Sequence, residues 1–307
     1  MSSPASGRRT RSAGLSLFVL VLVCAVLASG ALVVVELRAG RPSAGEPRCV
    51  VATTDPDGQR RRHTLSSEQA ANAALITAES VRRGTDPYAA VVALATAMQE
   101  SQLVNIDYGD RDSVGLFQQR PSQGWGTVEQ VMDPSYATGV FYDRLAEVDY
   151  AGLSVTEAAQ AVQRSGHPDA YARHEPLARA FADSLTGGTE ASLNCVLADP
   201  EQPGDAAATA DALGAAFGAA APAARAEAGR VVVPAPSGPT GWAVAHWAVA
   251  SAERLGIAEV SFDGRSWVRA DQRTTRFAPA PGWVDGAEAH PDGPPPAQDV
   301  VLVLASR

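Results

Sequence analysis

The stretch Tyr88–Ser101, YAAVVALATAMQES, decides much of the fold of this 307-residue chain. Its first eleven residues are apolar on nearly every side of a helix, and a helix that is apolar all round is buried. Asp86 and Pro87 stand directly before it, as an N-cap and a proline in the first helical turn. The pattern predicts a central buried helix whose last turn carries a glutamate, Glu100.

Further helix signals lie on both sides of this stretch. Ser66, Thr127 and Ser154 are each followed three residues later by Gln or Glu, which is the pattern of a capping box. Strong hairpin signals are missing between these positions. The sequence therefore predicts a compact all-α domain with one long irregular loop at 102–126.

Glu100 is the first candidate functional residue. The negative end of the helix dipole and apolar surroundings both disfavour a charged carboxylate there. A carboxyl group that stays partly protonated near neutral pH can act as a general acid. A solvated glutamate at a helix end is the commoner case, so position alone does not decide the matter.

The loop after Glu100 favours a binding site. Gly115 allows a tight backbone turn, Gln118 and Gln119 offer uncharged donors and acceptors, and Phe117 and Trp125 offer flat apolar faces. Rings of sugars stack on aromatic faces, and their hydroxyl groups pair with amides. Such a set of residues suits a sugar chain.

The residues Glu100-Ser101, Ser113 and GLFQQRP from Gly115 to Pro121 resemble the soluble lytic transglycosylase family. The resemblance implies an all-α lysozyme-like fold that cleaves the glycan strands of peptidoglycan, with Glu100 as catalytic acid/base. It also implies substrate-binding roles for ten residues: Ser101, Ser113, Gly115, Leu116, Phe117, Gln118, Gln119, Trp125, Gln163 and Tyr171. The third motif of the family, Ala-Tyr-Asn-x-Gly, is altered here, with Val162-Gln163 in place of Tyr-Asn.

Three functions remain open on this basis. A lytic transglycosylase needs one acid, because the acetamido group and 6-hydroxyl of the substrate complete the reaction, and Glu100 is the one convincing acid. A hydrolase needs a second carboxylate, for which Asp110 is a candidate. A catalytically weak protein that binds peptidoglycan or serves as a scaffold is the third alternative, and the altered third motif favours it.

Composition limits the partners. The formal net charge is −9, and a chain that binds nucleic acid needs clustered cations. No cofactor motif is evident. The five histidines do not form zinc-ligand spacings with the cysteines, so no metal site is expected.

The N-terminal region predicts export. Arg8, Arg9 and Arg11 precede an uncharged stretch, Ser12–Val35, that is long enough for a transmembrane helix with its N-terminus in the cytoplasm. A cleaved signal peptide is the alternative. Either places the rest of the chain outside the cytoplasm, with the cytoplasmic membrane, peptidoglycan strands and other cell-wall proteins as candidate partners.

Cys49 and Cys195 are the two cysteines outside the apolar stretch, and they bracket the helical segment. Outside the cytoplasm, such a pair predicts a disulfide, with two unpaired thiols as the alternative. Closing so long a loop stabilises a domain by about 4–5 kcal/mol in the chain-entropy model.

The C-terminal part predicts a small α+β domain that resembles domains appended to actinobacterial cell-wall proteins. It contains a helix from Thr240, a hairpin at Asp263-Gly264 and a final buried strand, and its tryptophans are expected in the core. The related domains carry a histidine-rich zinc motif, of which His290 and Asp292 remain, too few for a catalytic site. The whole prediction is a cytoplasmic tail, a transmembrane anchor, a stalk, a lysozyme-like domain, a linker and an α+β domain, at 1–11, 12–37, 38–63, 64–198, 199–229 and 230–307.

Overall fold

The structure is a computed structural model. It describes residues 46–54, 57–165, 170–200, 202–235, 238–269, 282–290, 293 and 298–306. All of them belong to one compact unit, Pro42–Arg307. The helices are α2 (Ser67–Arg83), α3 (Pro87–Ser101), α4 (Val128–Val131), α5 (Pro134–Ala146), α6 (Val155–Gln163), α7 (Glu175–Leu185), α8 (Ala206–Phe217), α9 (Pro239–Ala250), α10 (Ala252–Leu255) and α11 (Gly286–Ala289). The strands are β1 (Arg48–Thr54), β2 (Arg60–Ser66), β3 (Leu193–Val196), β4 (Arg225–Glu227), β5 (Arg230–Pro234), β6 (Ile257–Phe262), β7 (Arg265–Val268), β8 (Val284–Asp285) and β9 (Asp299–Leu304).

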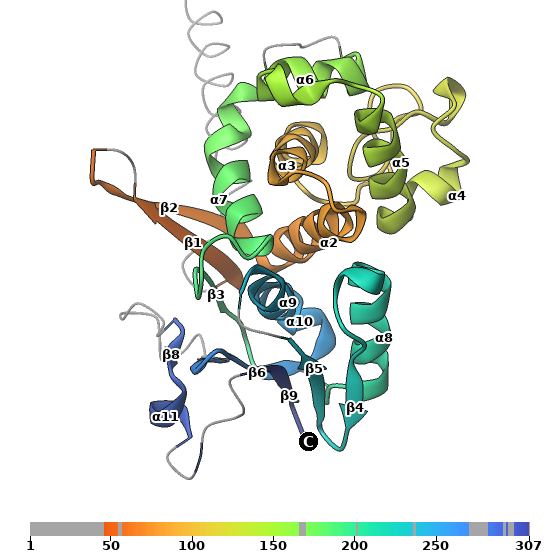
Figure 1. The fold of residues 1–307 in the computed structure, drawn as a ribbon. Helices are drawn as coiled ribbons and strands as arrows, with labels where there is room; N and C mark the ends of the chain where they lie inside the picture. Colours follow the sequence, from red (N-terminus) through yellow and green to blue (C-terminus); the bar gives the residue numbers. More distant parts are fainter. Residues whose placement is uncertain are drawn as a thin grey trace, which may run out of the picture. The chain divides into compact units, whose positions relative to one another are not determined.

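Helix α3 lies in the middle of α2, α5, α6 and α7 (Figure 1). Every residue from Ala89 to Met98 is buried, which confirms the prediction of a central apolar helix. The carboxylate of Asp86 accepts a hydrogen bond from the backbone N–H of Tyr88 and caps the start of α3. The capping box of Ser66 and Gln69 is likewise present at the start of α2.

The prediction of an all-α lysozyme-like domain is wrong, because a three-stranded antiparallel sheet in the order β2-β1-β3 is part of the same structure. Strands β1 and β2 pair as a hairpin in which Cys49 and Val51 of β1 point inward. Strand β3 completes the sheet from a position nearly 150 residues further along the chain. The pairing of β1 with β3 joins distant segments and leaves no local pattern, whereas the β1–β2 hairpin is local and lies in a segment that the sequence analysis assigned to a stalk.

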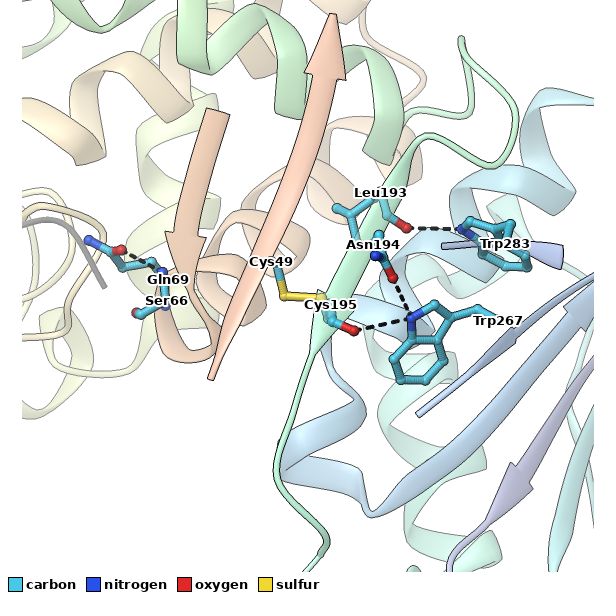
Figure 2. The surroundings of a disulfide bond; sticks show 8 residues. All are labelled: Cys49, Ser66, Gln69, Leu193, Asn194, Cys195, Trp267 and Trp283. Carbon is cyan, nitrogen blue, oxygen red and sulfur yellow. Dashed lines mark hydrogen bonds between the residues drawn. A yellow bond between two sulfur atoms is a disulfide. The ribbon is translucent and has the colours of Figure 1, made fainter. Parts of the chain in front are cut away.

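The predicted disulfide between Cys49 and Cys195 is confirmed, and it joins β1 to β3 where the two residues lie opposite each other. Figure 2 shows that two tryptophans from the C-terminal part approach the other edge of β3. The indole N–H of Trp267 donates to Asn194 Oδ1 at 2.9 Å, and that of Trp283 donates to the carbonyl of Leu193, also at 2.9 Å. Strand β3 is therefore joined to the N-terminal strand β1 on one side and to tryptophans of the C-terminal part on the other.

The second sheet has six strands in the order β4-β5-β9-β6-β7-β8, and all its pairs are antiparallel. The predicted hairpin at Asp263-Gly264 is confirmed: Phe262 pairs with Arg265, and both turn residues have positive φ, as a type I′ turn requires. The final strand, β9, lies between β5 and β6, in agreement with the prediction that it is buried.

Helix α9 packs against β6 and also against α2 and α7, so it forms the junction between the six-stranded sheet and the helices around α3. Its Trp242 makes an edge contact with Phe262 of β6. The core position that we predict for the C-terminal tryptophans is confirmed, because all four expose 7% or less of their surface, namely Trp242, Trp247, Trp267 and Trp283.

Residues 12–37, where the sequence predicts a transmembrane helix, lie outside the described residues. Among the residues that the structure describes, no helix has the length and apolarity needed to cross a membrane. The described part of the chain therefore contains no counterpart of the transmembrane helix in the predicted fold.

Candidate active site

The chain turns sharply after Glu100, at the end of α3. Gln102 and Leu103 both have positive φ, 57° and 58°, and their N–H groups bond to the carbonyls of Met98 and Ala97 at 3.2 and 3.1 Å. Two successive left-handed residues other than glycine cost of order 1–3 kcal/mol each and persist only where neighbours fix them. We therefore expect neighbouring side chains to hold this turn in place.

Side chains of α2 fix this turn. Gln69 Nε2 donates to the carbonyl of Gln102 at 2.7 Å, and Asn72 Nδ2 donates to the carbonyl of Leu103 at 2.8 Å. Because both carbonyls lie just beyond the last turn of α3, these bonds satisfy acceptors that the helix leaves without intrahelical partners. The position of Glu100 is thus set by α2 as well as by α3.

Glu100 contacts a buried tyrosine. The hydroxyl of Tyr171 lies 2.6 Å from Glu100 Oε1 and donates to it, while Glu100 itself is partly exposed. Tyr171 is fully buried. Its burial, followed by the charge of Glu100 and the hydrogen bond to it, raises the pKa of Tyr171 well above its usual value near 10. The hydroxyl therefore keeps its proton over the neutral range and remains a donor to Glu100.

The residue after Glu100 anchors the loop. Ser101 Oγ lies 2.7 Å from the carbonyl oxygen of Leu116 and donates to it. From the other side, Gln163 Nε2 at the end of α6 donates to the carbonyl of Phe117 at 2.7 Å. The structure thus brings Glu100, Ser101, the Gly115–Gln119 segment, Gln163 and Tyr171 together, although they come from segments more than 70 residues apart.

The loop backbone needs a glycine at Gly115. Its φ is 80°, and a Cβ there would meet the carbonyl oxygen of Val131 at 2.5 Å, a distance that real contacts do not show. Val114 and Gln119 form a small antiparallel bridge around it, and Gln118 has a φ of 46°. This tight turn leaves Gln118 partly exposed while its neighbours are buried.

Two predicted sugar platforms lie inside the protein. Phe117 is fully buried and stacks on Phe141 at a centroid distance of 4.5 Å. Trp125 is 5% exposed, and the guanidinium of Arg144 covers its ring at 3.4 Å. The other buried members of the predicted set are Ser101, Ser113, Gly115, Leu116, Gln119 and Tyr171. The amide nitrogen of Gln119 donates to the carbonyl of Ala137. These residues shape the loop from within.

The acidic residues of the loop differ in their environment. Asp112 accepts hydrogen bonds from Arg120 Nε and from the backbone N–H of Ser122, both at 2.8 Å. The bonds from Ser122, and then that from Arg120, hold the pKa of Asp112 well below its usual range, so it caps the loop as a carboxylate. Asp107 and Asp110 are exposed.

Two features next to the site were missed by the sequence reasoning. Tyr108 is the aromatic residue of this loop that is open to solvent, with 70% of its surface exposed, and Gln118 Nε2 donates to its carbonyl. Gln99 Oε1, beside Glu100 in the chain, accepts from Arg173 Nη2 at 2.8 Å and lies 3.1 Å from His174 Nε2. Burial, followed by the charge of Arg173, lowers the pKa of His174 to about 4, so its imidazole is neutral at pH 7.

Among the described residues, no three His, Cys, Asp or Glu side chains lie close enough to hold a metal ion. His290 bonds to Glu259 Oε1 in the C-terminal part, and Asp292 lies outside the described residues. No protein-family model matches the chain, and no curated protein matches it.

Proposed function

We propose that this protein cleaves the glycan strands of peptidoglycan outside the cytoplasm, with Glu100 as the single catalytic acid/base. The observation that carries the proposal is the contact of Glu100 with the Tyr171 hydroxyl, at a helix end where Ser101 also holds the Gly115–Gln119 loop. The motif residues that resemble lytic transglycosylases are therefore neighbours in space, although they are far apart in sequence.

The proposed reaction uses Glu100 twice. Protonated Glu100 first gives its proton to the glycosidic oxygen, which leaves as the bond to the anomeric carbon breaks. The acetamido group of the same sugar then stabilises the anomeric carbon. Glu100, now a carboxylate, takes the proton of the 6-hydroxyl as that oxygen attacks and closes an anhydro ring.

Tyr171 supports the second half of this reaction. Its hydrogen bond is strongest when Glu100 is charged, because a bond to an ionised acceptor is about twice as strong as a neutral one. Since the pKa of Tyr171 is raised, the hydroxyl is still protonated when the carboxylate forms. We therefore assign Tyr171 as a positioning residue for Glu100, and Gln118 and Gln163 as residues that shape or contact the glycan beside it.

The disulfide supports an extracytoplasmic location. Cys49 and Cys195 are joined across β1 and β3, and stable disulfides form mainly in oxidising compartments outside the cytoplasm.

Mass spectrometry of soluble products from purified peptidoglycan tests the reaction type. The full chain should release fragments that end in an anhydro sugar. Fragments with a free reducing end would contradict the one-carboxylate mechanism and favour hydrolysis with a loop aspartate such as Asp110. Absence of any released fragment, together with retention of the protein on insoluble peptidoglycan, would contradict cleavage and assign the site to binding.

A further inference from the structure

A cavity of about 570 Å³ lies away from Glu100, where α2, α5, α8, α9 and α10 meet. None of the candidate active-site residues lines it. Ser67 and Glu79 both do, so the cavity follows α2 for about 18 Å at 1.5 Å per residue. Its volume is within the range of small-ligand sites, roughly 300–1,000 Å³.

The apolar part of the lining is made of small side chains. Five alanines and three larger residues form it: Ala71, Ala212, Ala215, Ala216, Ala250, Leu75, Pro134 and Trp247. Such a surface leaves room for the backbone of a ligand but offers no deep pocket for a large side chain. The lining therefore fits an extended ligand with small apolar side chains.

Polar groups interrupt this surface. Thr138 lines the cavity and is fully buried, and its hydroxyl has no hydrogen-bond partner in the structure. A helical threonine usually satisfies its hydroxyl on the carbonyl four residues earlier, but Thr138 does not. Ser135 lies one turn away on the same helix and Asn72 lies on α2, and both line the cavity. A buried hydroxyl without a partner costs about 1–3 kcal/mol, so this lining favours a ligand that carries donors and acceptors along its length.

Charged groups of both signs stand at the cavity. Glu79 is already paired with Arg82 and Arg83. Glu68, Glu253 and Arg254 also line the cavity, are exposed, and make no ion pair with another described residue. A ligand with a free amino group and a free carboxylate would complement Glu68 and Arg254.

We propose that this cavity binds a short extended peptide with small side chains and free ends, its carboxylate at Arg254 and its amino group at Glu68. An extended chain advances about 3.3 Å per residue, so a peptide of four residues, about 13 Å long, fits within the length of about 18 Å along α2. Peptide amides pair with the hydroxyls of Thr138 and Ser135 and donate to Asn72 Oδ1, whose amide nitrogen already bonds to Leu103. An acyl chain would offer these oxygens no hydrogen bond. This activity does not depend on glycan cleavage at Glu100.

Calorimetric titration of the full chain with tetra-alanine tests the proposal. We expect a dissociation constant on the order of 1 mM, typical of a small ligand with few contacts. The Ala216→Phe variant fills the cavity and should weaken binding at least about tenfold. Ala208→Phe is the matched control, because Ala208 is exposed on the same helix and does not line the cavity, and it should bind as the unaltered chain does.

A peptide with a blocked carboxylate tests the role of that end. Tetra-alanine amide should bind more weakly than tetra-alanine, and Arg254→Gln should remove that difference. Melting temperatures of all variants verify that they are folded. Binding that Ala216→Phe leaves unchanged, no heat of binding for tetra-alanine at about 10 mM, or tighter binding of dodecanoic acid than of the peptide would each overturn the proposal.

Discussion

The end of α3 and the strand β3 are both junctions between distant segments, but their polar groups are used differently. At β3, the disulfide is buried and the indole N–H groups of Trp267 and Trp283 are bonded to the strand. At the end of α3, Glu100, Gln118 and Gln163 remain partly exposed, while the surrounding backbone is fixed by buried bonds. The comparison indicates that the polar contacts of β3 stabilise the fold. At the end of α3, by contrast, reactive and polar side chains remain accessible to a ligand while the backbone that carries them is held in place.

Removing the disulfide is the strongest test of the stabilising role of β3. The double variant Cys49→Ala, Cys195→Ala should lose about 4–5 kcal/mol of unfolding free energy, because the bond closes a loop across a separation of 146 residues. Urea unfolding measures the loss. Glycan cleavage under conditions where the variant is folded should be nearly unchanged. If glycan cleavage by the folded variant fell together with its unfolding free energy, the two junctions would not have separate roles.

Acid should weaken the junction around α9. Burial lowers the pKa of His246 to about 4, and its neutral ring bonds to the carbonyl of Ser184 and accepts from the N–H of Ser192. An unfolded histidine titrates near 6.5, so this contribution is fully present above pH 6.5 and is lost as the pH falls towards 4. The loss amounts to about 3 kcal/mol.

Urea unfolding between pH 7.5 and 4 measures this effect. The variant His246→Asn keeps a polar side chain that cannot titrate, so its stability should fall less steeply over the same range. The difference between the two chains isolates His246 from His174, whose pKa is also lowered. Parallel curves for the two chains would contradict the assignment.

Tyr171→Phe tests the candidate site with a smaller expected effect. The ring is kept, and one hydrogen bond to a charged group, worth about 1.5–3 kcal/mol, is lost. We expect kcat for glycan release to fall about 10- to 100-fold with little change in KM. The alkaline limb of the pH–rate profile, where Glu100 loses the proton that it must donate, should shift to higher pH, because the Glu100 carboxylate loses a hydrogen-bond donor. A change in KM alone would assign Tyr171 to substrate binding.

Local signals predicted a large part of the helical structure. The cap at Asp86, the capping boxes and the apolar run of α3 act within a few residues, and all are present as predicted. The disulfide followed from cysteine number and placement. Strand β3 was missed because it pairs with β1 from the opposite end of the helical region. The β1–β2 hairpin is local and was missed because residues 38–63 were interpreted as a stalk.

The candidate site was predictable in its members but not in their roles. Phe117 and Trp125 were predicted to offer ring faces to a sugar, but an aromatic ring serves core packing equally well, and here both are buried. The bond from Tyr171 to Glu100 spans 71 residues, so no spacing rule points to it. The cavity beside α2 depends on side chains from five helices and has no sequence signal at all.

The most direct test of the account is glycan release by Glu100→Gln, which keeps the shape of the side chain and removes its proton. Glu129→Gln is the matched control, because Glu129 is exposed on α4. The account predicts no release by Glu100→Gln, unchanged release by Glu129→Gln, and equal melting temperatures. Undiminished release by Glu100→Gln would contradict the central claim and place the chemistry at another acid.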